Sequence, residues 1–139
     1  MNKKFEQISL KPGFMKHNGG IFFKTVSEKE FEFKASIKEN HLNAAGITHG
    51  GFISAIIDAG AGTAAHKAAG QNPCVTISLE LKFISPVKLG QELIGTTKIQ
   101  KKTKSMVFLT CELKSSDKIV ATASGVWKIL KLPGAGPGG

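Results

Sequence analysis

A single carboxylate, Asp58, lies in the middle of an apolar stretch of small residues that spans positions 49–65. The composition predicts a helix from about Gly50 to Ala69, ended by the stop signal at residues 70–73. A carboxylate buried in such a helix costs several kcal/mol unless it is partnered, protonated or used in chemistry. Asp58 is therefore the first catalytic candidate, and the alternative is a structural carboxylate that accepts hydrogen bonds from a neighbouring turn or lysine.

The predicted start of this helix, His49-Gly50-Gly51, offers a second kind of chemistry. Backbone N–H groups are unpaired at a helix N-terminus, where the dipole is positive, and glycine leaves them open to a ligand oxygen. The arrangement suits a carbonyl that becomes an oxyanion during acyl transfer. Alternatively, the two glycines only permit tight entry of the helix under a sheet.

The spacing of these two features constrains how they act together. Asp58 lies eight residues beyond Gly50, which corresponds to about 12 Å along a helix. One substrate carbonyl cannot contact both groups of the same chain. If both act on one bond, two subunits must present their helices side by side in opposite directions, as in a two-fold dimer with two equivalent sites.

The polar loop before the helix contains further candidates. The amide of Asn43 is able to hold a water or a substrate carbonyl, or else Asn43 forms a turn. His41 and His49 are possible acids or bases, but no serine or cysteine lies in a nucleophile elbow, and His49 is predicted to fix the loop by a hydrogen bond. His17 and His66 are expected to be surface or packing residues. The sequence has no metal-ligand spacing and no phosphate-binding glycine motif.

Composition narrows the class of protein. The formal charge of +9 comes from 19 lysines without any arginine, which weakens a nucleic-acid function because base and phosphate recognition relies on arginine. Lysines still attract phosphorylated ligands as point charges. Cys74 and Cys111 lack the spacing of a disulfide framework or zinc site. No signal sequence or membrane span is predicted, so we expect a cytoplasmic location.

Apart from the helix, the sequence predicts strands in an α+β arrangement. Two strands precede the helix and are joined near residues 27–29, and four follow it, giving one central helix against one antiparallel sheet. In the first strand after the helix, Val75, Ile77 and Leu79 alternate with polar residues, as do Leu81 and Phe83, which predicts one buried face. The expected strand ranges are 21–26, 31–38, 74–84, 92–101, 105–114 and 118–130.

The domain organisation is predicted to be simple. Residues 1–18 form a helix or loop extension, residues 19–131 form a single domain, and residues 132–139 form a flexible Pro/Gly-rich tail.

Several motifs in order resemble one known family. They are Asn43-x-x-Gly46-x-x-His49-Gly50-Gly51, Asp58 nine residues after the histidine, Val75-Thr76-Ile77-x-Leu79, and Phe83-x-x-Pro86-Val87-x-x-Gly90. Together they resemble the PaaI-like branch of the hotdog-fold acyl-CoA thioesterases over about residues 19–130.

The resemblance implies a long central helix wrapped by a curved antiparallel sheet of five to six strands. It also implies a homodimer with shared active sites, often assembled as a dimer of dimers into a homotetramer. Asp58 would be the general base or nucleophile toward the thioester, and the amide of Gly50 or Gly51 would polarise its carbonyl. By the same resemblance, Asn43 would orient water or the thioester, His49 the leaving side, and Thr76 would assist the water.

A thioester is already activated, so an oxyanion donor and a carboxylate suffice and no metal or redox cofactor is expected. The phosphates of coenzyme A would be attracted by surface lysines, which are otherwise only a solvated face. The candidates are Lys82, Lys88, Lys101, Lys102 and Lys104.

Two other functions share the expected ligand. A hotdog hydratase or dehydratase would need a histidine paired with an acidic residue, whereas Asp58 beside His49-Gly50-Gly51 favours hydrolysis. A non-catalytic acyl-CoA binding protein is disfavoured because no regulatory or DNA-reading segment is evident.

Overall fold

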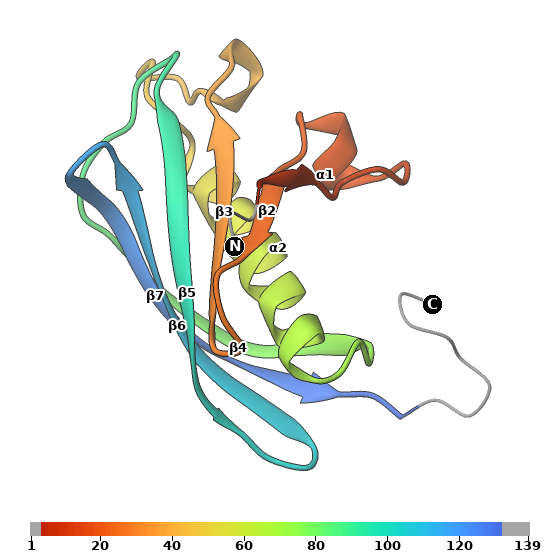
Figure 1. The fold of residues 1–139 in the computed structure, drawn as a ribbon. Helices are drawn as coiled ribbons and strands as arrows, with labels where there is room; N and C mark the ends of the chain where they lie inside the picture. The colour runs from red at the N-terminus through yellow and green to blue at the C-terminus, as the bar shows by residue number, and fades with distance from the viewer. Residues whose placement is uncertain (1–3, 132–139) are drawn as a thin grey trace.

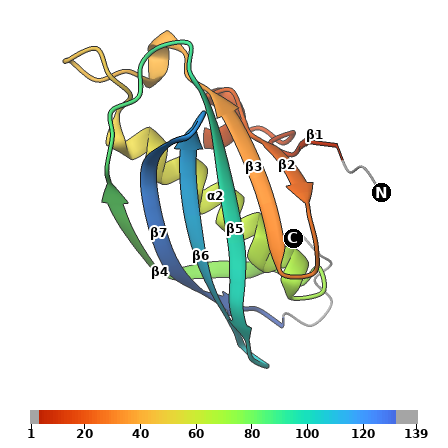
Figure 2. The same cartoon turned by 60° about the vertical axis from the view of Figure 1, so that its left-hand side comes forward.

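The computed structural model describes residues 4–131, in which a curved antiparallel sheet wraps around one long helix (Figures 1 and 2). The seven strands are arranged in the order β1-β2-β3-β5-β6-β7-β4. The elements are β1 (Glu6–Gln7), α1 (Phe14–His17), β2 (Phe22–Thr25), β3 (Glu30–Ser36), the 3-10 helix η1 (Glu39–His41), α2 (Gly50–Ala68), β4 (Cys74–Phe83), β5 (Glu92–Lys102), β6 (Met106–Ser115) and β7 (Lys118–Ile129).

This architecture confirms the predicted α+β fold with one central helix. The strand count is higher than the predicted five to six because the segment before residue 18 contributes β1, a strand of two residues that pairs with β2. The same segment contains α1. The predicted tail at residues 132–139 lies outside the described residues.

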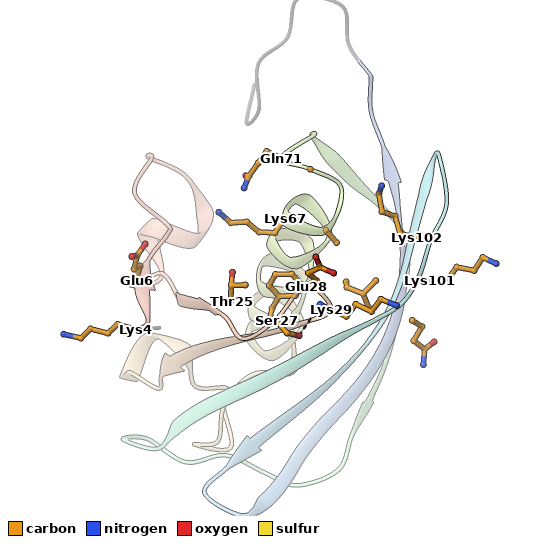
Figure 3. Close-up of a pocket in the computed structure, with 15 residues that line it drawn as sticks. Lys4, Glu6, Thr25, Ser27, Glu28, Lys29, Lys67, Gln71, Lys101 and Lys102 are labelled. Atoms are coloured by element: carbon orange, nitrogen blue, oxygen red, sulfur yellow. Dashed lines mark hydrogen bonds between the residues drawn. The ribbon is translucent and has the colours of Figure 1, made fainter. Parts of the chain in front are cut away.

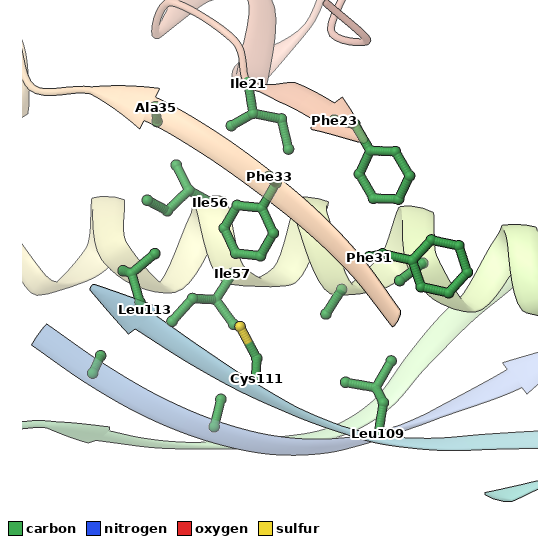
Figure 4. Packing of buried hydrophobic residues seen from close by; sticks show 14 of the residues in the cluster. Ile21, Phe23, Phe31, Phe33, Ala35, Ile56, Ile57, Leu109, Cys111 and Leu113 are labelled. Carbon is green, nitrogen blue, oxygen red and sulfur yellow. The ribbon is translucent and has the colours of Figure 1, made fainter. Parts of the chain in front are cut away.

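Helix α2 packs on the sheet through pairs of buried residues that recur every four positions, which gives the apolar stripe expected of a core-facing helix. Phe33 of β3 is fully buried between α2 and the sheet (Figure 4). A Cβ atom at Gly60 of α2 or at Gly95 of β5 would overlap the Phe33 ring. These two glycines therefore allow the helix to approach the sheet closely. The stripe comprises Phe52, Ile53, Ile56, Ile57, Gly60, Ala61, Ala64 and Ala65.

Strand β4 lies at one edge of the sheet and, in the described chain, pairs only with β7. A β-bulge interrupts this pairing between Thr76 and Ser78. The prediction of a single buried face on β4 was wrong at both ends of the strand, because Val75, Ile77 and Phe83 are 45%, 51% and 57% exposed. An extra residue in a bulge reverses the side-chain alternation. Thr76 consequently faces the helix, while Leu79 resumes packing against the core.

Candidate active site

Asp58 is exposed in the single chain, contrary to the expected burial. It falls outside the buried stripe of α2 and faces the start of β4, where its side chain has one specific partner. The hydroxyl Oγ1 of Thr76 donates a 2.7 Å hydrogen bond to Asp58 Oδ1. The helix and the bulged strand thus jointly orient the Asp58 carboxylate, whose Oδ2 is left for other partners.

This pair lies in a cavity of about 440 Å³ between α2, β4 and the N-terminal segment. The helix contributes small side chains, so the space beside Asp58 stays open. The volume falls in the range of small-molecule sites. Its other lining residues are Ile8, Ser9, Ala59, Gly62, Thr63, His66, Pro73, Cys74 and Trp127.

Asn43 and Gly50 line a different cavity, of about 370 Å³, at the end of β4 beside Phe83. Asn43 Oδ1 accepts hydrogen bonds from the backbone N–H groups of Ala45 at 2.9 Å and Ile47 at 3.3 Å. This is the side-chain turn geometry typical of asparagine. The same residue therefore fixes the loop through its oxygen, and in residues 4–131 its Nδ2 has no hydrogen-bond partner.

His49 caps the N-terminus of α2. Its Nδ1 accepts a 2.8 Å hydrogen bond from the N–H of Gly51, so that amide is already used. The N–H of Gly50 has no acceptor among the described residues, and a Cβ at Gly50 would lie 3.5 Å from the Phe83 ring. Of the two predicted oxyanion donors, the Gly50 amide is the one available to a ligand.

His41 has a structural environment. It is 2% exposed and stacks on Phe52, with ring centroids 3.6 Å apart. Its Nδ1 accepts a hydrogen bond from the Lys38 N–H at 2.9 Å, so the proton lies on Nε2, which donates to the Asn18 carbonyl at 2.7 Å. Both nitrogens are occupied, which leaves no free position for acid or base chemistry.

The predicted site residues consequently divide into two groups within one chain. Asp58 and Thr76 share one cavity, Asn43 and Gly50 share the other, and His49 with Gly51 forms the helix cap between them. Trp127 and His66 were not among the predicted site residues although both line the Asp58 cavity. Trp127 pairs with Thr76 across β4 and β7, a register that the strand pattern alone does not reveal.

A third cavity, of about 1060 Å³, lies at the C-terminal end of α2 and contains none of the predicted catalytic residues (Figure 3). Five lysines and two glutamates line it, and they include Lys101 and Lys102 but not Lys82, Lys88 or Lys104. Lys4 and Lys101 extend to opposite sides in Figure 3. This geometry is typical of a solvated basic surface with long-range attraction for anions.

Residues 4–131 contain no cluster of three His, Cys, Asp or Glu side chains suited to a metal ion. None of the helices in these residues is long and apolar enough to cross a membrane. Both cysteines are free, and burial raises the pKa of the Cys111 thiol to about 12. Cys111 therefore packs as a neutral core residue.

Comparison with known proteins defines the class of protein. Residues 45–122 match the family model of the thioesterase superfamily. "Putative esterase PA0474" of Pseudomonas aeruginosa is 32% identical over 112 residues, which cover 80% of this chain and 84% of the relative. Acyl-coenzyme A thioesterase 13 of Mus musculus is 25% identical over 112 residues, covering 79% of this chain and 80% of the relative.

Solved structures agree with the sequence relatives. Zebrafish thioesterase superfamily member 2 superimposes with a TM-score of 0.79 at 18% identity, over 88% of this chain and 90% of that structure. The E. coli PaaI protein from the phenylacetic acid degradation operon superimposes with a TM-score of 0.76 at 20% identity, over 84% and 83%. The chain belongs to the thioesterase superfamily and has the hotdog fold.

Proposed function

We propose that this protein hydrolyses acyl thioesters of coenzyme A in sites shared between two chains. The observation that carries the proposal is the division of the site residues along one edge strand. The Asp58 and Thr76 group lies at the start of β4, and the Asn43 and Gly50 group lies at its end beside Phe83.

The free edge of β4 supports the dimer. A strand whose outer edge is unpaired and carries exposed apolar residues is a template for pairing with another chain. If two β4 strands pair antiparallel about a two-fold axis, the start of each strand lies beside the end of the other. That arrangement brings Asp58 of one chain to Gly50 of its partner and covers Val75, Ile77 and Phe83, which are 45%, 51% and 57% exposed in the single chain.

The groups then have complementary roles. The partner's Gly50 N–H donates to the thioester oxygen as it becomes negative, and Asn43 Nδ2 donates beside it. Asp58 removes a proton from water, whose oxygen bonds to the carbonyl carbon; alternatively, Asp58 attacks that carbon itself, and water then cleaves the resulting mixed anhydride and gives up one proton. The carbon–sulfur bond breaks, the thiolate takes up the proton, and the products are a carboxylic acid and coenzyme A. Thr76 keeps the Asp58 carboxylate oriented.

Hydrolysis fits the described residues better than hydration or dehydration. The latter would need a histidine paired with Asp58. His41 is committed to the backbone through both nitrogens, and His49 caps the helix. His66 lines the Asp58 cavity but lies eight residues further on, about 12 Å along the helix.

The decisive experiment replaces Asp58 by Asn and measures thiol release from a panel of acyl-CoA substrates. We expect kcat/KM to fall about 10³-fold, within the range for loss of a general base. The chain has one other aspartate, Asp117, at an exposed hairpin turn, so Asp117→Asn is the matched control and should keep full activity. Unchanged turnover in Asp58→Asn, with wild-type dimerisation, would contradict the proposal.

Sharing of the site is tested by mixing two inactive variants, Asp58→Asn and Asn43→Ala. After subunit exchange at equal amounts, half of the dimers are mixed, and each mixed dimer has one intact site of two. Activity should return to about a quarter of the wild-type value. If exchange is demonstrated by mass-tagged subunits and no activity returns, the site is not shared.

A further inference from the structure

The indole N–H of Trp127 is among the polar groups of the Asp58 cavity that the proposed chemistry does not use. Trp127 is 1% exposed, yet it lines this cavity. Within residues 4–131, the indole Nε1 makes no hydrogen bond. It is also not fully enclosed, because the one fully enclosed side-chain N or O atom without a partner in these residues is Thr97 Oγ1. The N–H group is therefore unpaired and reaches the cavity.

Two glycines leave room for this indole. A Cβ atom at Gly125, two residues before it on β7, would overlap the six-membered ring. A Cβ at Gly62 of α2 would lie 3.3 Å from Nε1. The ring is packed against the strand at one end, and its N–H emerges beside the bare backbone of the helix at the other.

The indole also has a defined position relative to the carboxylate. Trp127 is the cross-strand neighbour of Thr76, which donates to Asp58. Gly62 follows Asp58 by four residues, about 6 Å along α2, and an extended chain of single bonds advances about 1.2 Å per bond. A hydrogen-bond acceptor about five bonds from the thioester carbon would therefore reach the indole N–H.

We propose that Trp127 is a specificity determinant that donates a hydrogen bond to an oxygen about five bonds from the thioester carbon, with Gly62 keeping the approach open. This inference rests on the proposed function and narrows its substrate class to compact acyl groups that carry an oxygen acceptor at that distance. A site with an unpaired buried donor discriminates against a ligand that cannot accept its hydrogen.

The test compares 5-oxohexanoyl-CoA with 5-methylhexanoyl-CoA, in which a methyl group replaces the carbonyl oxygen. The wild-type protein should favour the oxo substrate about 10-fold in kcat/KM, the usual upper value for one neutral hydrogen bond. Trp127→Phe keeps an aromatic ring without the N–H and should reduce the ratio to about 1. Gly62→Ala places a Cβ 3.3 Å from Nε1, which narrows the approach to the N–H, and should lower the ratio as well. Acetyl-CoA is too short to reach Trp127, so its kcat/KM in each of the three proteins serves to normalise the ratio for any general effect of the substitution.

A binding measurement separates this inference from the proposed function. Trp127 is the single tryptophan and the chain has no tyrosine, so intrinsic fluorescence reports on this indole alone. Titration with the non-hydrolysable thioether S-(5-oxohexyl)-CoA should shift the emission to longer wavelength, whereas S-(5-methylhexyl)-CoA should not.

The outcomes are distinct. A selective shift without hydrolysis of any acyl-CoA would support the role of Trp127 in binding and contradict the thioesterase activity. Two outcomes would overturn the inference and leave the activity in place. One is that the wild-type protein hydrolyses both substrates at equal rates, and the other is that its preference for the oxo substrate is unchanged in both Trp127→Phe and Gly62→Ala.

Discussion

The two ends of strand β4 are built differently although we propose that they act on one bond. At the start of the strand, the important group is a side chain, Asp58, held by the hydroxyl of Thr76. At the end, the important group is a backbone amide, that of Gly50, at the start of a capped helix. A carboxylate needs an oriented partner, whereas an amide donor needs only an open approach and a fixed helix terminus.

This difference determines which substitutions are informative. At the Asp58 end, changing the side chain removes the chemistry directly. At the Gly50 end, the side chain is already absent, so a test must remove the N–H itself. The predictions below follow from that contrast, in order of expected effect.

Among these further variants, the largest effect is expected from Gly50→Pro. Gly50 is the first residue of α2, a position where proline is well tolerated because its missing N–H has no partner within the helix. The variant should fold and lose about 10²-fold or more in kcat, as for other oxyanion donors. Gly50→Ala is the matched control, since it keeps the N–H and its Cβ meets the Phe83 ring at an ordinary 3.5 Å. Equal activities of the two variants would exclude this amide as the oxyanion donor.

The next effect is expected from Ile77→Lys at the open edge of β4. Ile77 is 51% exposed, and a charge there should oppose pairing of two β4 strands. We expect the dimer dissociation constant, measured by analytical ultracentrifugation, to rise at least about 10-fold, with activity lost in parallel on dilution. The control is Leu10→Lys, which changes an exposed leucine outside the edge strand. A stable, active dimer of Ile77→Lys would argue against the shared site.

A smaller effect is expected at Thr76. Replacement by Val keeps the shape of the side chain and removes the donor to Asp58. We expect kcat to fall about 10-fold, because this factor corresponds to the free energy of one hydrogen bond. Thr76→Ser keeps the hydroxyl and should stay close to wild type. If Thr76→Val is as active as Thr76→Ser, the hydrogen bond does not support catalysis.

The smallest effect is expected at His49. Its ring accepts the Gly51 N–H, so His49→Ala should reduce the free energy of unfolding by about 1 kcal/mol, the typical value of an N-cap. His49→Asn restores a capping acceptor and should recover most of that stability in thermal or urea unfolding. A proton-transfer role would instead change the pH profile of kcat in both variants while leaving stability unchanged.

The sequence predicted the fold well because its signals are local. The apolar run of α2, with a glycine and a proline after it, and the alternating strands identify the elements without knowledge of their contacts. The two-residue strand β1 could not be predicted because its residues are strand only by pairing with β2.

The candidate site was less predictable. Spacing along one helix indicated that Asp58 and Gly50 cannot meet within a chain, and the two separate cavities agree with that reasoning. The bulge at Thr76 and the pairing of Thr76 with Trp127 depend on strand register, which is set by tertiary packing. The exposure of Asp58 was missed because a composition of small apolar residues does not specify which face of a helix is buried.

The open edge of β4 has a thermodynamic consequence. Folding completes the core of each chain, whereas in the proposed dimer pairing of the edges completes the site, so the two events should respond differently to dilution. Partner binding stabilises the folded chain by mass action, and the thermal midpoint should therefore rise with protein concentration. At low concentration, catalysis should disappear while the helix and sheet are still intact.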